Sequence, residues 1–174
     1  MKLAEALDLA HKAVGELRPY CHRIEIAGSI RRKKPQVGDI ELVCIPMGAK
    51  LFRFVDAVNK WPRIKGLPTG KYTQREYHGI KIDLFICNPK TWACNFAIRT
   101  GSAEFSHGLA IRAREIGLCF KNAQLWRMSF DEPRLSPLST YINEEVDVFT
   151  ALRIKWVEPE NRLGARDVVP LKDQ

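Results

Sequence analysis

Apolar residues recur every three or four positions along several stretches of the chain, and this spacing predicts amphipathic helices. The first predicted helix is ended by Pro19, and its apolar face consists of Leu3, Leu7, Ala10, Val14 and Leu17. The same spacing predicts further helices over residues 51–61, 102–116 and 144–152. Gly117 stands where the second of these needs a C-terminal cap, and Asn143 stands where the third needs an N-cap.

Shorter stretches alternate between apolar and polar residues, which is typical of β-strands. We expect strands over residues 23–27 and 37–45, and a hairpin of 72–77 and 80–87 whose turn is His78-Gly79. Because helices and strands are interleaved, the pattern predicts an α+β fold. We expect a main body over residues 1–117 and a small α+β C-terminal subdomain over residues 118–174.

Charge is the feature of the composition that changes this picture most. The chain of 174 residues has a net charge of +8 and a pI near 9.4, which indicates a polyanionic partner, nucleic acid before an acidic membrane surface. No apolar run approaches the length of a membrane span and the first residues lack a signal peptide, so we expect an intracellular, cytoplasmic protein. The five cysteines form no Cys-x-x-Cys pair and are expected to be buried, reduced thiols.

Three carboxylates interrupt predicted strands that are otherwise apolar. Asp39 and Glu41 are two residues apart, so their side chains emerge on the same face of a strand, and Asp83 interrupts the apolar stretch 82–86. Burying three carboxylates together is costly through desolvation and mutual repulsion, and divalent cations remove that cost. Oxygen ligands of this kind suit Mg²⁺ or Mn²⁺. The residues alone also allow exposed strand ends, or ion pairs with the many arginines.

Two further stretches carry groups that bind phosphate. Gly28-Ser29 is followed by Arg31 and Arg32 and lies between two predicted strands. Glycine lets a phosphate approach the backbone, serine adds a hydroxyl, and arginine offers a charge-assisted fork. An ordinary turn with a solvated basic face explains the same residues. The stretch Thr100-Gly101-Ser102 begins a predicted helix, where free N–H groups can hold an anion, although N-capping by Ser102 needs no function.

Taken in order, these stretches resemble the motifs of family X DNA polymerases, the group of polymerase beta. Residues 28–32 and 38–41 resemble their Gly-Ser-x-Arg-Arg and Gly-Asp-x-Asp signature. Residues 81–85 resemble the strand that bears their third carboxylate, and residues 99–105 resemble their Tyr-Phe-Thr-Gly-Ser segment. Residues 145–162 resemble the end of their C-terminal subdomain. Each motif is weak alone, but five in the right order are highly specific.

The resemblance implies a nucleotidyltransferase palm, whose mixed sheet carries two Mg²⁺ or Mn²⁺ ions, followed by a C-terminal subdomain around the nascent base pair. It implies that Asp39 and Glu41 bridge both ions, while Asp83 ligates the catalytic ion and helps to activate the primer 3′-hydroxyl. The nucleotide-binding residues that it implies are Gly28, Ser29, Arg32, Gly38, Ile98, Arg99, Thr100, Gly101 and Ser102. We also expect Arg112 and Arg114 to contact nucleic acid, although they could equally form a solvated face.

The sequence departs from the family pattern at several of these positions. Glu41 stands where most relatives have Asp, and its extra methylene shifts the carboxylate. Ile98 and Arg99 replace the Tyr-Phe pair that lines the sugar pocket, and Ser106 stands where relatives often carry an Asn that touches the incoming base. We therefore expect a modest preference for dNTPs over NTPs and low fidelity.

The resulting expectation is a monomeric DNA-directed DNA polymerase of family X type. It would extend the primer of a primer–template or gapped DNA with nucleoside triphosphates, and gap-filling repair is a candidate role. The stretch before residue 24 is too short for the N-terminal domains of larger relatives, so we expect a minimal form of palm and C-terminal subdomain. Two alternatives remain: a template-independent or RNA-directed nucleotidyltransferase, and a non-catalytic nucleic-acid-binding module of the same fold.

Overall fold

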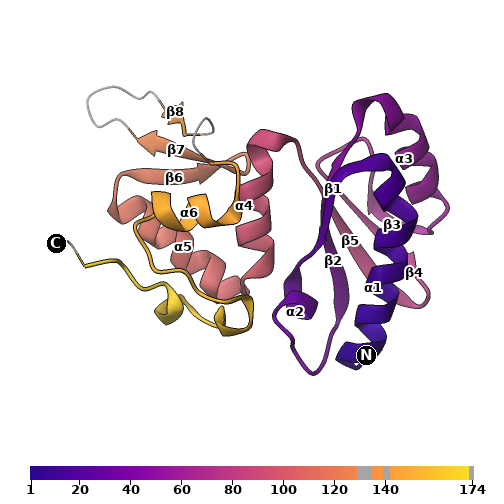
Figure 1. Ribbon diagram of the computed structural model, residues 1–174, viewed down its shortest axis with the longest axis horizontal. Coiled ribbons are helices and arrows are strands. Elements are labelled where there is room, and N and C mark those ends of the chain that lie inside the picture. Colours follow the sequence, from indigo (N-terminus) through magenta and orange to yellow (C-terminus); the bar gives the residue numbers. More distant parts are fainter. Residues whose placement is uncertain (129–134, 139–141, 173–174) are drawn as a thin grey trace. The chain divides into compact units, whose positions relative to one another are not determined.

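The computed structural model describes residues 1–128, 135–138 and 142–172, and the chain forms two compact units, Met1–Asn88 and Pro89–Gln174 (Figure 1). Each unit combines helices with its own sheet, so the fold class is α+β, as predicted. The division falls between Asn88 and Pro89, whereas the sequence led us to expect it after Gly117. The helices that follow Asn88 pack against later elements of the second unit, and they therefore belong to it.

The first unit is built on a five-stranded mixed sheet with the order β1-β2-β5-β4-β3. Strands β2 and β5 are parallel, and the other neighbouring pairs are antiparallel. The strands are β1 (Cys21–Ile26), β2 (Asp39–Pro46), β3 (Arg63–Gly66), β4 (Tyr72–Tyr77) and β5 (Ile80–Ile86). The helices are α1 (Leu3–Leu17), α2 (Gly28–Arg31) and α3 (Leu51–Asn59), with 3₁₀ turns at Arg18–Tyr20 and Gly48–Lys50.

Helices α1 and α3 cover one face of this sheet (Figure 1), and the core of the unit lies between them and the strands. Alternate residues of the two parallel strands point into this core and are fully buried: Ile40, Leu42 and Cys44 on β2, and Ile82 and Leu84 on β5. Burial of each large aliphatic side chain contributes about 1.5–3 kcal/mol, which fixes the register of the strands. The residues next to them along the strands, Asp39, Glu41 and Asp83, consequently point to the opposite face.

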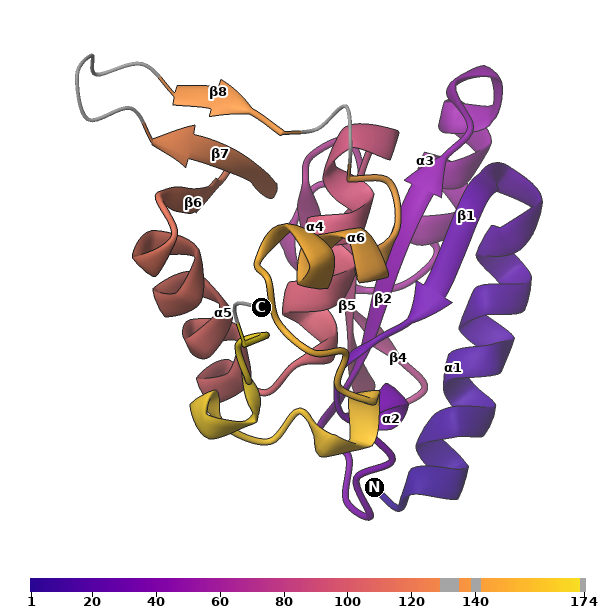
Figure 2. The ribbon, with the colours of Figure 1, turned by 60° about the vertical axis from the view of Figure 1, so that its left-hand side comes forward.

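The second unit begins with two consecutive helices and contains a three-stranded antiparallel sheet with the order β6-β7-β8 (Figure 2). Its helices are α4 (Pro89–Thr100), α5 (Ala103–Glu115) and α6 (Glu145–Ala151). Its strands are β6 (Leu118–Lys121), β7 (Gln124–Met128) and β8 (Leu135–Pro137). After α6 the chain passes through 3₁₀ turns at Pro159–Asn161 and Ala165–Asp167, the second of which packs on α5.

The short helix α2 and the strands β3, β6, β7 and β8 were not predicted, and neither was the longer helix α4. Two of these, α4 and β3, lack the pattern that sequence reasoning needs. Helix α4 buries Trp92, Cys94, Phe96 and Thr100 around much of its circumference, so it shows no amphipathic period. Strand β3 is a short edge strand whose residues are all exposed.

One predicted cap is wrong. Glu144, not Asn143, occupies the N-cap position of α6. The carboxylate of Asp147 accepts hydrogen bonds from the backbone N–H groups of both Asn143 and Glu144, at 2.9 and 2.8 Å, and this anchors the helix start.

Four of the five cysteines, Cys21, Cys44, Cys87 and Cys94, are buried as predicted, whereas Cys119 is partly exposed. Within the described ranges, no helix is both long enough and apolar enough to cross a membrane.

Candidate functional site

The three carboxylates singled out by the sequence lie on neighbouring strands of the first unit. Asp39 and Glu41 belong to β2 and Asp83 belongs to β5, its parallel neighbour. In the register of this pair, Glu41 stands beside Asp83 and Asp39 stands beside Lys81. Because adjacent strands lie about 4.8 Å apart, the register brings the backbone positions of Glu41 and Asp83 into direct proximity. All three side chains are partly exposed on the face opposite α1 and α3.

The charges around Asp39 are not balanced. Burial raises the pKa of the Asp39 carboxyl above its ordinary value, and the negative charge of Asp83 raises it further. The positive charges of Lys81 and Arg32 act in the opposite direction but do not cancel these effects. Asp39 and Asp83 are therefore close enough to repel each other, and a bound cation would relieve that repulsion.

Asp83 is held by two side chains that sequence reasoning missed. The Tyr72 hydroxyl and the Gln74 amide both donate hydrogen bonds to its Oδ1 atom, at 2.8 and 2.7 Å. Both donors come from β4, where Gln74 pairs with Asp83 across the antiparallel ladder. The predicted hairpin turn at His78-Gly79 fixes this register, so the alternation of β4 could have identified both residues.

The side chain of Glu41 lies against Gly28, at the start of α2. A Cβ atom on Gly28 would stand 1.9 Å from Glu41 Oε2 and 2.7 Å from Glu41 Cδ, and Gly28 has a φ of +61°. Glycine is therefore required here both by the backbone conformation and by the close approach of the carboxylate. In this arrangement, no group of three or more Asp, Glu, His or Cys side chains among the described residues is placed to hold a metal ion.

Three further residues predicted to bind the triphosphate, Ser29, Arg32 and Gly38, belong to the same unit as the carboxylates. The Oγ atom of Ser29 is buried and makes no hydrogen bond within the described part of the chain. Arg32 caps α2, and its charge lowers the pKa of Asp39, so it lies near the carboxylates. Gly38 is exposed, and no described atom lies within 4 Å of where its Cβ would stand, so packing does not explain a glycine there.

The stretch Thr100-Gly101-Ser102 lies in the second unit and joins two helices. Thr100 is the buried last residue of α4, and Ser102 is the N-cap of α5. The Oγ atom of Ser102 accepts a hydrogen bond from the backbone N–H of Phe105 at 3.0 Å, so N-capping by Ser102 occurs as the sequence suggested. A Cβ on Gly101 would stand 2.6 Å from a ring carbon of Phe105, which explains the glycine.

The remaining predicted residues of the second unit differ in how accessible they are. Ile98 is partly exposed, and its carbonyl oxygen accepts a hydrogen bond from the Ser106 hydroxyl at 2.7 Å, while Arg99 is exposed at the end of α4. Arg112 is engaged within the unit, because its Nε donates to the Leu152 carbonyl and its Nη1 pairs with Glu115. Arg114 is exposed on α5. Of the two arginines predicted to contact nucleic acid, Arg114 is thus the more accessible.

The first unit also contains a cavity of about 280 Å³ that includes none of the predicted site residues. Its lining residues are Glu16, Lys60, Trp61, Pro62, Glu76, Tyr77 and His78. Tyr77 and Trp61 donate hydrogen bonds to the Glu16 carboxylate at 2.6 and 3.1 Å, so its polar groups largely satisfy one another.

Residues 96–163 match the DNA polymerase beta thumb family, and this stretch lies entirely within the second unit. The match covers less than half of the chain, and no curated protein matches the sequence. It supports a relationship to polymerase beta-like proteins of family X through that one domain, and a polymerase thumb implies DNA binding.

Proposed function

We propose that the chain is a nucleotidyltransferase of the family X DNA polymerase type, which adds deoxynucleotides to a primer 3′-hydroxyl. The observation that carries this proposal is the register of β2 and β5, which sets Glu41 beside Asp83 and leaves Asp39 on the same face. The thumb match of residues 96–163 supports DNA as the acceptor.

Two divalent cations, Mg²⁺ or Mn²⁺, are the cofactors that this reaction requires, and the chemistry of the donor set fits them. The three side chains offer only carboxylate oxygens. Burial and the negative charge of Asp83 raise the pKa of the Asp39 carboxyl, and bound cations would offset both effects. Asp39, Glu41 and Asp83 would hold the ions, after the Glu41 side chain rotates away from Gly28 to another rotamer. Bound there, they supply Lewis-acid activation of the hydroxyl and neutralise the triphosphate.

The chain's own residues bind and orient the two substrates. The unbonded Ser29 hydroxyl is available to donate to a phosphate oxygen, and Arg32 brings positive charge to the same place. Tyr72 and Gln74 hold Oδ1 of Asp83 in place, so the carboxylate is oriented to accept the hydrogen bond of the 3′-hydroxyl. The 3′-hydroxyl gives its proton to Asp83, its oxygen bonds to the α-phosphorus, and the bond from that phosphorus to the oxygen bridging to the β-phosphate breaks, so pyrophosphate leaves. This reaction depends mainly on positioning and charge stabilisation.

The test is extension of a labelled primer across a one-nucleotide gap in the presence of Mg²⁺. We expect Asp39→Asn and Asp83→Asn to reduce the rate by about a hundredfold or more, because each removes a negative charge that would hold the cations in place. Asp56→Asn is the matched control, since Asp56 is an exposed carboxylate on α3, outside the site. Wild-type rates in the Asp39 and Asp83 variants would refute the catalytic role of these carboxylates.

Further arms of the same assay separate the alternatives. Extension without a template, on an RNA template, or equally well with NTPs would assign a different nucleotidyltransferase activity. DNA binding without any extension would favour a non-catalytic binding module, and the position of Glu41 against Gly28 is the observation that keeps this second candidate open.

A further inference from the structure

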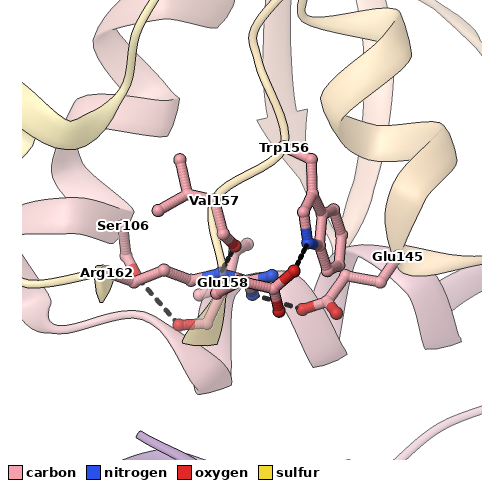
Figure 3. A network of polar contacts seen from close by, with 7 residues as sticks. Ser106, Glu145, Trp156, Val157, Glu158 and Arg162 are labelled. Atoms are coloured by element: carbon pink, nitrogen blue, oxygen red, sulfur yellow. Dashed lines mark hydrogen bonds and ion pairs between the residues drawn. The ribbon is translucent and has the colours of Figure 1, made fainter. Parts of the chain in front are cut away.

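A buried arginine organises the second unit at a point that the proposed mechanism does not use. The Arg162 side chain is fully buried, and its Nη1 atom forms an ion pair with Glu145 Oε1 at 2.5 Å, with Glu145 itself almost fully buried (Figure 3). Its Nε atom donates a hydrogen bond to the Val157 carbonyl at 2.8 Å. Two donors on one guanidinium therefore tie α6 to the segment that follows it.

Aromatic rings surround this guanidinium. Its central carbon lies 4.8 Å from the ring centres of Phe149 and Trp156 and 5.8 Å from that of Phe105. The Trp156 indole is fixed in turn by a hydrogen bond to Glu158 at 2.9 Å (Figure 3). The rings come from α5, α6 and the segment after α6, so Arg162 lies where these three elements meet. Contacts with several ring faces favour a cation and restrict its position.

The backbone at Arg162 holds the turn between α4 and α5. The Ser102 N–H donates to the Arg162 carbonyl at 3.2 Å, and the Ser102 hydroxyl donates to the Leu163 carbonyl at 2.8 Å. We call residues 158–168 the C-terminal strap. Further along the strap, a Cβ on Gly108 of α5 would stand 2.9 Å from Ala165 Cα, so the strap lies tightly against that helix. The strap thus contacts α5 at its start and at its middle.

This arrangement contributes position more than stability. A buried arginine–carboxylate pair is on average no more stabilising than apolar residues of the same volume, because both charges lose their hydration. What such a pair does supply is a single permitted geometry, since the planar guanidinium needs both acceptors in place. Here that geometry fixes the backbone at Arg162 and Leu163, whose carbonyl oxygens both accept hydrogen bonds from Ser102.

We propose that Arg162 is a positioning residue, which sets the turn Thr100-Gly101-Ser102 through the strap and thereby sets the nucleotide affinity of that turn. The inference rests on the proposed function in one respect, because it takes the turn to contact the incoming nucleotide, a role that only the family resemblance implies for Thr100-Gly101-Ser102. The mechanical part, from the Arg162 side chain through its own carbonyl to Ser102, stands on the second unit alone.

The mechanical part is tested by amide hydrogen exchange in the full chain, which needs no activity. We expect Arg162→Lys, which keeps the charge but loses the bond to Val157, to speed exchange of the Ser102 amide by about tenfold. The Met128 amide, bonded to the Gly117 carbonyl at 2.8 Å in the same unit, should be unchanged. Arg166→Lys, on the exposed part of the strap, is the matched control. Unchanged exchange at Ser102 in Arg162→Lys overturns the proposal.

The nucleotide part is tested by steady-state primer extension with the same variants. Arg162→Lys should raise KM for the incoming dNTP by about tenfold while the affinity for primer–template stays within a factor of about two. If Arg162→Lys does not fold, Glu145→Gln replaces it, because it keeps the hydrogen bond and removes the charge. Parallel losses in dNTP and DNA affinity would indicate general destabilisation and overturn the positioning role. A wild-type chain that never extends a primer refutes the proposed function, and the exchange experiment still decides whether Arg162 sets the turn.

Discussion

Gly28 is the residue whose substitution tests the geometry of the carboxylate site most directly. An alanine there must adopt a φ of +61°, a left-handed conformation that raises the free energy of an L-residue by about 1–2 kcal/mol. Its Cβ would also stand 1.9 Å from Glu41 Oε2, so the Glu41 side chain must move. Because that atom is the end of a flexible side chain, the displacement adds only about 0.5–1.5 kcal/mol. We therefore expect Gly28→Ala to lower the free energy of unfolding by about 1.5–3.5 kcal/mol.

Gly79 provides a matched control for this substitution. It has a φ of +81°, and no described atom lies within 4 Å of where its Cβ would stand. Gly79→Ala therefore carries the backbone strain of a left-handed alanine without a steric conflict, and we expect a loss of about 1–2 kcal/mol. The difference between the two variants isolates the displacement of Glu41.

The assay is urea denaturation of both variants and wild type at constant temperature and salt, with unfolding monitored by circular dichroism. Equal stability losses in the two variants would refute the close approach of Glu41 to Gly28.

Three other predictions address the metal ions, the nucleic acid and the alkaline pH dependence. If Mg²⁺ binds the carboxylates, it should stabilise wild type by about 2.7 kcal/mol at a hundredfold excess over its Kd, but not Asp83→Asn; equal rises in Tm for both proteins would count against the site. DNA affinity should fall linearly with salt on logarithmic axes, and Arg114→Gln should reduce the slope by about one unit; an unchanged slope would remove Arg114 from the interface. Burial raises the pKa of the Cys94 thiol to about 12 in the folded chain, despite a hydrogen bond with the Leu125 backbone that lowers it. The stability that this shift contributes is complete below the unfolded thiol pKa of about 8.5 and is lost as pH rises toward 12. Cys94→Ala should therefore reduce the decrease in the urea midpoint of unfolding between these pH values. An unchanged decrease would show that Cys94 does not cause it.

Local pattern was sufficient for those elements whose sequence carries a period. The apolar face of α1 and the alternation of β2, β4 and β5 were readable because each element buries one side and exposes the other. The carboxylates at positions 39, 41 and 83 stood out for the same reason, since each interrupts an apolar strand. Helix α4 was missed because it is buried around much of its circumference, and the boundary between the two units was misplaced with it.

Partners distant in the chain were beyond the reach of the sequence. That Glu41 lies against Gly28 depends on how a loop returns to its strand. No local pattern marked Arg162 as buried, because arginine is ordinarily exposed and its partner Glu145 lies on a different element.

The sequence by itself determined the α+β class, the strands that carry Asp39, Glu41 and Asp83, and the resemblance that names a reaction. These follow from side-chain periodicity and from motifs of a few adjacent residues, which are properties of the chain before it folds. Only the tertiary structure decided that Glu41 stands beside Asp83, that Ser29 Oγ is buried without a bond in the described chain, and that the strap holds Ser102. The physical reason is that strand register, burial and long-range hydrogen bonds arise when distant segments pack together, and no single segment encodes them alone.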